Sequence, residues 1–208
     1  MRVAPEGWPF IAIAFAVLAV LAWCRIWPAV VVWLPIAVWV VAFFRDPVRT
    51  PPAGDALIVA PADGRVVSVI SVDEPTFLGG PAVRIAIFMN VFNVHVNRYP
   101  SDGRVAHRHY HPGRFLNAAV DKASTENEQS SIGLETTRGR ILIRQIAGLV
   151  ARRIITDHPV GTAVTRGQRL GLIRFGSRVD VFLPAGSQAL VKVGDATVAG
   201  ETVIGSWP

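Results

Sequence analysis

Cysteine is almost absent from this 208-residue sequence, which contains only Cys24. A single cysteine cannot form an intrachain disulfide or a cysteine-based zinc site, so a disulfide scaffold and a zinc knuckle are both excluded. The nucleotide-binding patterns G-x-G-x-x-G and Walker A are missing too, and so is the zinc-binding pattern H-E-x-x-H. We therefore expect neither a metal nor a nucleotide cofactor.

Charged residues are also scarce, at 17% of the chain against 51% hydrophobic residues. This balance excludes an intrinsically disordered chain, which needs low hydrophobicity and high charge. It also exceeds the usual apolarity of a soluble domain, so a membrane segment is expected. The net charge of +6 suits an anionic partner. Charge alone does not choose between nucleic acid and acidic lipid.

The apolar residues gather at one end of the chain, between residues 8 and 44, where Arg25 is the only charged side chain. As one helix this block would be about 55 Å long, against a hydrocarbon core of about 30 Å. We therefore expect residues 1–46 to form a membrane-associated helical hairpin, either two short spans or a re-entrant loop, turning near Arg25–Pro28. A secretory signal peptide is disfavoured, because a second apolar run follows without a cleavage site.

Basic residues flank this apolar block on both sides. Arg2 precedes it, and Arg45 and Arg49 follow it. Because cytoplasmic flanks of membrane segments are enriched in Arg and Lys, both ends are expected on the cytoplasmic side of the cell membrane.

Residues 47–208 have a different pattern, in which short β-branched runs alternate with turn residues. No long apolar period of 3.6 residues occurs there, and the polar stretch Asn117–Ser131 reads as an exposed loop. We predict a β-rich α+β fold with a compact two-sheet or barrel-like domain. The expected strands are Ala56–Ala60, Arg65–Val72, Ala82–Met89, Val91–Val96, Gly139–Ile146, Val150–Ile155, Leu170–Ile173, Val179–Leu183 and Leu190–Val193.

A few residues in this domain could carry chemistry. Ser177 follows Gly176 inside strand-like sequence, where glycine is costly unless a special backbone conformation or a close approach is needed. Asp63 begins an Asp-Gly pair, and His95 lies in an apolar run. Taken singly, these are typical of a bulge, a turn and a buried strand histidine.

Three further histidines, His107, His109 and His111, alternate along the chain. In a strand they would project from one face, but no carboxylate pair accompanies them. A solvated basic edge is therefore favoured over a metal site.

Taken together, the motifs resemble the phosphatidylserine decarboxylase family, in its short, archaeal-type proenzyme form. Each motif is weak alone, but they occur in order over nearly the whole chain behind the apolar hairpin. They are Phe44-Arg45-Asp46-Pro47, Pro61-Ala62-Asp63-Gly64, Asn93-Val94-His95-Val96-Asn97-Arg98, Pro112–Ala118, Asp121–Ser124, Glu126-Asn127-Glu128 and Arg174–Asp180.

The resemblance implies a chain that cuts itself between Gly176 and Ser177. It would leave a large subunit, residues 1–176, and a small subunit, residues 177–208, with Ser177 converted to a pyruvoyl group. That group would form a Schiff base with phosphatidylserine and release CO₂ and phosphatidylethanolamine, with no metal or nucleotide. The implied partners are phosphatidylserine and anionic membrane lipids, with a possible homo-oligomer and no nucleic acid.

The resemblance also assigns roles to other residues. Asp63 matches the aspartate implicated in self-cleavage, and His95 matches the first histidine of the substrate segment. The larger enzymes carry a second histidine where this chain has Arg98, which cannot act as a base. The base is therefore left open between Asp63, His95 and the three alternating histidines. Candidates for contact with the lipid phosphate are Arg98, Arg114 and Lys122.

Two other functions fit parts of the sequence. A membrane-anchored biotinyl- or lipoyl-like adaptor would need a modifiable lysine in a tight hairpin. Lys192 lies in a strand-like run instead, which disfavours this function. A Ser/Lys hydrolase would need a lysine near Ser177, and the chain has only Lys122 and Lys192.

Overall fold

The computed structural model describes residues 2–114, 126–148, 153–174 and 176–208. By its internal contacts the chain divides into two compact units, Met1–Val48 and Arg49–Pro208. Each unit has a distinct architecture, helical in the first and β-rich in the second.

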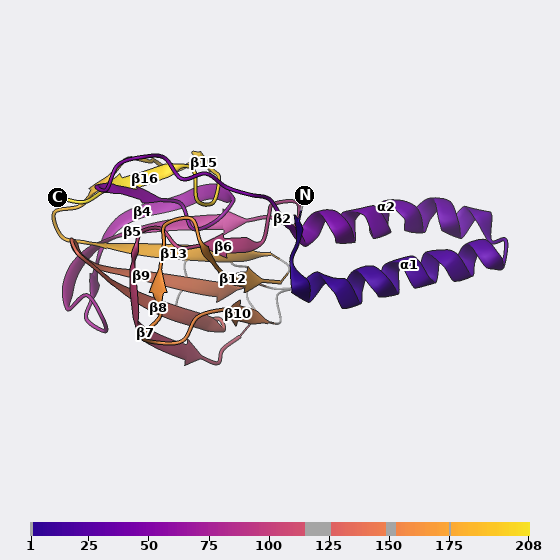
Figure 1. Ribbon diagram of the computed structural model, residues 1–208, viewed down its shortest axis with the longest axis horizontal. Helices are drawn as coiled ribbons and strands as arrows, with labels where there is room; N and C mark the ends of the chain where they lie inside the picture. The colour runs from indigo at the N-terminus through magenta and orange to yellow at the C-terminus, as the bar shows by residue number, and fades with distance from the viewer. Residues whose placement is uncertain (1, 115–125, 149–152, 175) are drawn as a thin grey trace. The chain divides into compact units, whose positions relative to one another are not determined.

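The first unit is a pair of antiparallel helices, α1 (Trp8–Trp23) and α2 (Trp27–Phe43), and the predicted helical hairpin is thereby confirmed (Figure 1). A short 3₁₀ turn, η1 (Pro5–Gly7), leads into α1. The reversal lies at residues 24–26, where Arg25 has a φ of +55°. Trp33 Nε1 donates to the carbonyl oxygen of Ala14 at 2.8 Å and ties the helices together. At the open end, β1 (Arg2–Val3) pairs with β2 (Arg45–Asp46).

Both helices are apolar on every side, and large side chains such as Trp23 and Val31 are exposed. Residues 5–23, which include η1, form a helix long and apolar enough to cross a membrane, whereas α2 is shorter, at 17 residues. A helix that is apolar all round normally lies in a protein core or in lipid. Because these helices leave most of their surface uncovered, the unit fits membrane association.

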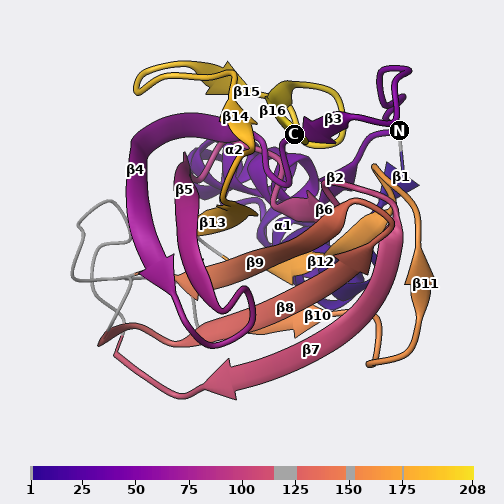
Figure 2. The same ribbon diagram turned by 90° about the vertical axis from the view of Figure 1, so that its left-hand side faces the viewer.

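The second unit is built on an eight-stranded antiparallel sheet with the order β11-β7-β8-β9-β13-β5-β4-β15. The sheet curls strongly into a half-barrel, as Figure 2 shows, and so confirms the predicted barrel-like β domain. Its strands are β4 (Gly64–Glu74), β5 (Gly80–Met89), β7 (Gly103–His111), β8 (Gln129–Thr136), β9 (Gly139–Ala147), β11 (Ala163–Val164), β13 (Ser177–Pro184) and β15 (Ala196–Thr197).

Two smaller sheets complete this unit. One has the order β10-β12-β6 and the other β14-β16-β3. Residues of both sheets, including Ile173 and Ile58, belong to the same hydrophobic core as the large sheet. Their strands are β3 (Leu57–Val59), β6 (Val96–Arg98), β10 (Ile154–Thr156), β12 (Arg169–Ile173), β14 (Gln188–Ala189) and β16 (Val203–Ser206).

Strand β13 separates two environments, because successive side chains of a strand point to opposite faces. Val179, Val181 and Leu183 enter the main core, whereas Phe182 packs in a small separate cluster with Ala82 and Leu142. Every residue from Ser177 to Leu183 is buried. The strand that carries the predicted cleavage site is therefore central and covered on both faces.

Three local predictions were wrong. The strand expected at Val91–Val96 is mostly a turn, in which Asn90 and Asn93 bond to neighbouring backbone amides, and β6 begins at Val96. Leu190–Val193 forms no strand. The exposed loop expected at Asn117–Ser131 ends early, because Asn127–Ser131 is buried and β8 begins at Gln129. The last prediction assumed that polar residues are exposed, but polar side chains can be buried when hydrogen bonds satisfy them.

Candidate active site

Ser177 is the first residue of β13 and is fully buried. It pairs with Met89 at the end of β5 on one side and with Ala147 at the end of β9 on the other. Its Oγ donates to Met89 Sδ at 3.4 Å. A thioether is a weak acceptor, so this hydroxyl is held in place without a strong hydrogen bond.

Gly176, directly before β13, has a φ of +66°, in the left-handed region that L side chains rarely adopt. No described atom outside its chain neighbours lies within 4 Å of the place a Cβ would occupy, so the glycine is required by backbone conformation and not by space. The sequence anticipated a special conformation at this glycine, and the structure has one.

Asp63 directly precedes β4. The first residues of β4 and of β13, which begins with Ser177, both pair with the last residues of β5, so Asp63 and Ser177 lie at the same end of the large sheet. Its Oδ2 accepts a 2.7 Å bond from Arg49 Nη2, and its Oδ1 accepts one of 2.7 Å from the Ala199 amide. Next in the chain, a Cβ on Gly64 would collide with the carbonyl oxygen of Phe88 in β5. Only β5 separates β4 from β13, so the starts of these two strands lie two strand spacings apart, about 10 Å.

His95 is fully buried just ahead of β6. Its Nδ1 lies 3.0 Å from the carbonyl oxygen of Asn93, and its own carbonyl accepts from the Ile173 amide at 3.4 Å. Ile173 ends β12, and the chain reaches Ser177 four residues later. The pairing of β6 with β12 therefore brings His95 to the segment that leads into Ser177.

A buried ladder of polar side chains also reaches this site. Asn97 Nδ2 donates to Met89 Sδ at 3.6 Å, so it shares that sulfur atom with Ser177 Oγ. Gln145 Nε2 donates to Asn97 Oδ1 at 2.8 Å, and Thr156 Oγ1 donates to Gln145 Oε1 at 3.1 Å. Amides without solvent contact in a core are expected to be hydrogen-bonded in this way.

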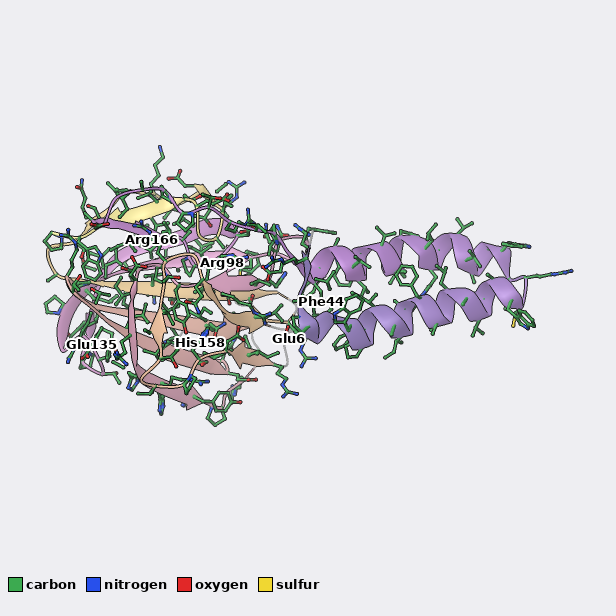
Figure 3. The ribbon with its side chains drawn as sticks, in the orientation of Figure 1. Glu6, Phe44, Arg98, Glu135, His158 and Arg166 are labelled. Atoms are coloured by element: carbon green, nitrogen blue, oxygen red, sulfur yellow. The ribbon has the colours of Figure 1, made fainter. Side chains whose placement is uncertain are left out.

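The predicted phosphate-contacting residues lie in different environments. Arg98 is buried inside the β-rich unit, and its Nη1 donates to the Gly167 carbonyl at 3.0 Å (Figure 3). Arg114 is exposed and pairs with Glu126 at 3.5 Å. Lys122 lies outside the described residues. Of the two described residues, Arg114 is the one exposed to solvent, and the role of each of the three stays a prediction.

The alternating histidines share one face, as expected. His107, His109 and His111 line a cavity of about 330 Å³ together with Arg144, on strands β7 to β9. Arg144 alternates with the core residues of β9, so this cavity lies on the face of the sheet opposite Ser177. These three histidines therefore do not share the face of Ser177, and the base for the predicted self-cleavage stays a prediction. Within the described ranges no group of His, Cys, Asp or Glu is arranged to hold a metal ion.

On that same opposite face, β13 carries a buried ion pair. Arg178 donates to both carboxylate oxygens of Asp180, at 2.7 and 2.9 Å. Arg84 Nε lies 4.0 Å from the same carboxylate. Burial raises the pKa of Asp180, and the charges of Arg178, Arg84 and Arg144 oppose that rise. The Arg178–Asp180 pair lies in the part of β13 that directly follows Ser177.

Sequence reasoning did not single out Asn97, Gln145, Met89 or the Arg49–Asp63 pair. For Asn97 a signal was present, because its spacing of two from His95 puts both side chains on one side of an extended segment. Gln145 offered a weaker signal, as an uncharged polar residue next to Arg144 in an otherwise apolar run. The other two contacts join residues distant in sequence, and no local pattern predicts them.

Comparison with known proteins decides the family. A sequence model of the family described as phosphatidylserine decarboxylase matches residues 36–205. The chain belongs to the phosphatidylserine decarboxylase family. The match to the family covers Asp63, His95, Gly176 and Ser177, so all four lie in the shared part of the chain.

Curated family members match along nearly their full lengths, and each is named phosphatidylserine decarboxylase proenzyme. The protein from Symbiobacterium thermophilum is 51% identical over 99% of this chain and 96% of its own. That from Aromatoleum aromaticum is 50% identical over 99% and 95%, and that from Nitrosomonas europaea is 48% identical over 99% and 95%. The short form of the family recognised in the sequence is thereby confirmed.

Proposed function

We propose that this protein decarboxylates phosphatidylserine, using a pyruvoyl group that it makes from its own Ser177. One observation carries the proposal within this family: Ser177 is buried at the head of β13, behind a glycine in the left-handed conformation. Asp63 and His95 come to the same edge of the fold from distant parts of the sequence. A serine placed in this way suits attack on its own backbone better than attack on a solvent-borne substrate.

The first step is attack of Ser177 Oγ on the carbonyl carbon of Gly176. The Oγ–C bond forms, the C–N bond of the peptide breaks, and the chain becomes an ester with a free amine on residue 177. A base must take the hydroxyl proton, and Asp63 and His95 are the candidates. The weak bond to Met89 Sδ makes the hydroxyl easy to release.

Asp63 fits an orienting role at least as well as the role of base. Both of its carboxylate oxygens accept hydrogen bonds, from Arg49 and from the Ala199 amide. These bonds hold the Ala62–Gly64 turn against the edge where Ser177 begins its strand. His95, which is buried and joined to β12, is then the residue better placed to move a proton.

The site fits the group that the proposal requires. Ser177 supplies its carbon atoms, the left-handed Gly176 permits the break, and no described side chain occupies the space beside Gly176. The pyruvoyl carbonyl supplies an electrophile for the substrate amine and a sink for the electron pair left by CO₂. In that reaction His95 would bind the substrate carboxylate or deliver a proton. Arg98, Arg114 and Lys122 stay candidates for the phosphate.

The two subunits would remain joined after the cut. The small subunit, residues 177–208, would begin with β13, which pairs with β5 along Ser177–Pro184 and with β9 along Ser177–Phe182. Core side chains of β13 and β16 belong to the same cluster as those of the large subunit, residues 1–176. Cleavage would therefore cost little in stability, because both ladders and the core persist.

The test is the covalent state of the purified protein. Mass spectrometry of the denatured protein should show two polypeptides, one ending at residue 176 and the other beginning at residue 177. The smaller one should be blocked to Edman sequencing, and borohydride should reduce its carbonyl group. Ser177→Ala should stay one inactive chain. Ser177→Thr could attack but would not yield a pyruvoyl group. A wild-type protein that decarboxylates while its backbone is unbroken would overturn the proposal.

The proposal includes attachment to the cytoplasmic face of the cell membrane. The apolar pair α1–α2 supports the attachment, and the flanking Arg2, Arg45 and Arg49 support the side. Protease added to inverted membrane vesicles should digest the β-rich unit, whereas right-side-out vesicles should protect it. The reverse pattern would overturn the orientation and leave the chemistry untouched.

A further inference from the structure

The side-chain amide of Asn97 is a buried donor that shares its acceptor atom with Ser177. Asn97 Nδ2 and Ser177 Oγ both donate to Met89 Sδ, at 3.6 and 3.4 Å. All three residues are fully buried. Around one sulfur atom, the structure therefore gathers the reacting oxygen and an N–H donor that the self-cleavage step described above does not use.

The orientation of the Asn97 amide is set by a hydrogen bond from Gln145. Gln145 Nε2 donates to Asn97 Oδ1 at 2.8 Å, which makes that oxygen the acceptor end. Gln145 is oriented in turn, because its own Oε1 accepts from Thr156 Oγ1, which lies 3.1 Å from Ser130 Oγ. Rotation of the Asn97 amide would break the 2.8 Å bond inside the core, so its NH₂ group stays turned toward Met89 Sδ, the atom to which Ser177 Oγ also donates.

The partner of this donor is a poor one. A thioether sulfur accepts hydrogen bonds weakly, whereas a charged oxygen accepts them about twice as strongly as a neutral one. An NH₂ group paired with sulfur therefore loses little when it donates to a negatively charged oxygen instead. Since Ser177 Oγ bonds to the same sulfur atom, charge that develops on that oxygen would be stabilised by a donor already oriented by the ladder.

We propose that Asn97 stabilises Ser177 Oγ when that oxygen leaves, in the step after the ester has formed. The inference rests on the proposed self-cleavage. In this step a base removes the Cα proton of residue 177, the electron pair forms a Cα=Cβ double bond, and the Cβ–Oγ bond breaks. Its electron pair stays on Oγ, which departs as part of the new Gly176 carboxylate. Water then converts the dehydroalanine to the pyruvoyl group and releases ammonia.

Gln145 acts as a positioning residue in this proposal. Among the described residues its side chain bonds to Asn97 and Thr156 rather than to Ser177 or Gly176, so its effect passes through Asn97 Oδ1. The two residues should therefore fail in the same way when changed. Each change should allow the ester to form and then slow its breakdown, because the donor serves the leaving oxygen and not the attacking one.

The decisive variant is Asn97→Asp, which keeps the acceptor for Gln145 and the side-chain shape but replaces the NH₂ donor. We expect formation of the small subunit to slow at least tenfold and the full-length ester to accumulate. Neutral hydroxylamine should split that ester at 176/177 and release a small chain whose amino-terminal serine is readable by Edman sequencing. Wild type, by contrast, should give the blocked small chain.

Two further variants keep the test independent of folding. Gln145→Leu leaves Asn97 in place but releases its orientation, and it should accumulate the same ester with a smaller slowing. Ser131→Ala, in the same strand but bonded to Arg144 on the opposite face of the sheet, should process within about twofold of wild type. Thermal unfolding of Asn97→Asp in a Ser177→Ala background reports whether the fold persists.

The outcomes separate this inference from the proposed function. If wild type itself is never cleaved, the proposed function fails. If wild type is cleaved but Asn97→Asp matches its rate, or stalls as a chain that resists hydroxylamine although folded, then the inference about Asn97 is wrong and self-cleavage stands.

Discussion

Arg49 and Asp63 form a 2.7 Å ion pair at the edge of the sheet where Ser177 begins its strand. Both side chains are largely buried, with exposed fractions of 13% and 14%. The pair links the start of the β-rich unit to the turn before β4, and the Ala199 amide completes the set of donors to Asp63. Family resemblance assigns Asp63 to self-cleavage, and these contacts show what holds it there.

We expect Asp63→Asn to slow processing at least tenfold and to lower the free energy of unfolding by about 1–3 kcal/mol. The loss follows because a charged hydrogen-bond acceptor disappears and Arg49 faces an amide instead of a carboxylate. Gel analysis of cleavage over time and thermal unfolding measure the two effects. Glu201→Gln is the matched control, since Glu201 contacts Arg49 only at 3.5 Å from a more exposed position. That control should change stability by less than about 1 kcal/mol.

Gly176→Ala should slow cleavage and lower the free energy of unfolding by about 1–2 kcal/mol, because an L side chain is strained at a φ of +66°. Stability is measured in the Ser177→Ala background, which keeps one chain. Gly79→Ala is matched in backbone cost, since Gly79 has a φ of +78° and equally open surroundings. It should cost similar stability and leave cleavage at the wild-type rate. Equal slowing in both variants would show that the effect is general strain.

Asp180→Asn should be strongly destabilising, by about 3–5 kcal/mol, because it leaves the buried Arg178 without its carboxylate. Glu135→Gln offers the exposed counterpart, since Glu135 pairs with Arg140 at 2.8 Å with both side chains about half exposed. That change should cost about 0–1 kcal/mol. Chemical denaturation of the two variants side by side tests the contrast. Similar losses would mean that the buried pair contributes no more than a surface pair.

Glu74→Gln should weaken the hairpin between β4 and β5 at neutral pH and flatten the acid limb of stability. Burial acts to raise the pKa of Glu74, but hydrogen bonds from the Leu78, Phe77 and Thr76 amides together outweigh it and lower the pKa. A lowered pKa stabilises the fold above the unfolded value of 4.5, and this stabilisation is lost as pH falls through the folded value.

Melting curves at pH 7 and near pH 4 provide the measurement for Glu74. The variant should lose about 1–3 kcal/mol at pH 7, with a smaller difference at acid pH. Asp73→Asn, at the neighbouring exposed position, should leave both curves nearly unchanged. If Glu74→Gln had the same stability as wild type at both pH values, the carboxylate of Glu74 would not contribute to the stability of this hairpin.

Much of the fold could be predicted from local patterns. The apolar block with one internal arginine predicted the helical hairpin, and β-branched runs predicted β4, β5, β9, β12 and β13. The wrong predictions concern segments in which polar residues are buried or in which apolar residues form a turn instead of a strand. Residues 127–131 look solvent-exposed in sequence, yet Asn127 Nδ2 donates to the Ala147 carbonyl at 2.7 Å, beside Ser177. A local pattern cannot show that a distant strand will supply such a partner.

The order of motifs along the chain was enough to place it in its family and to single out Gly176, Ser177, Asp63 and His95. The family could be recognised because a motif is a run of local neighbours, which the sequence states directly, whereas the roles of these four residues stay predictions. The tertiary structure alone decided what surrounds them: Arg49 on Asp63, Met89 and Asn97 beside Ser177, and the alternating histidines on the opposite face of the sheet. These relations depend on strand order and register, which arise from packing of the whole core and not from any short segment.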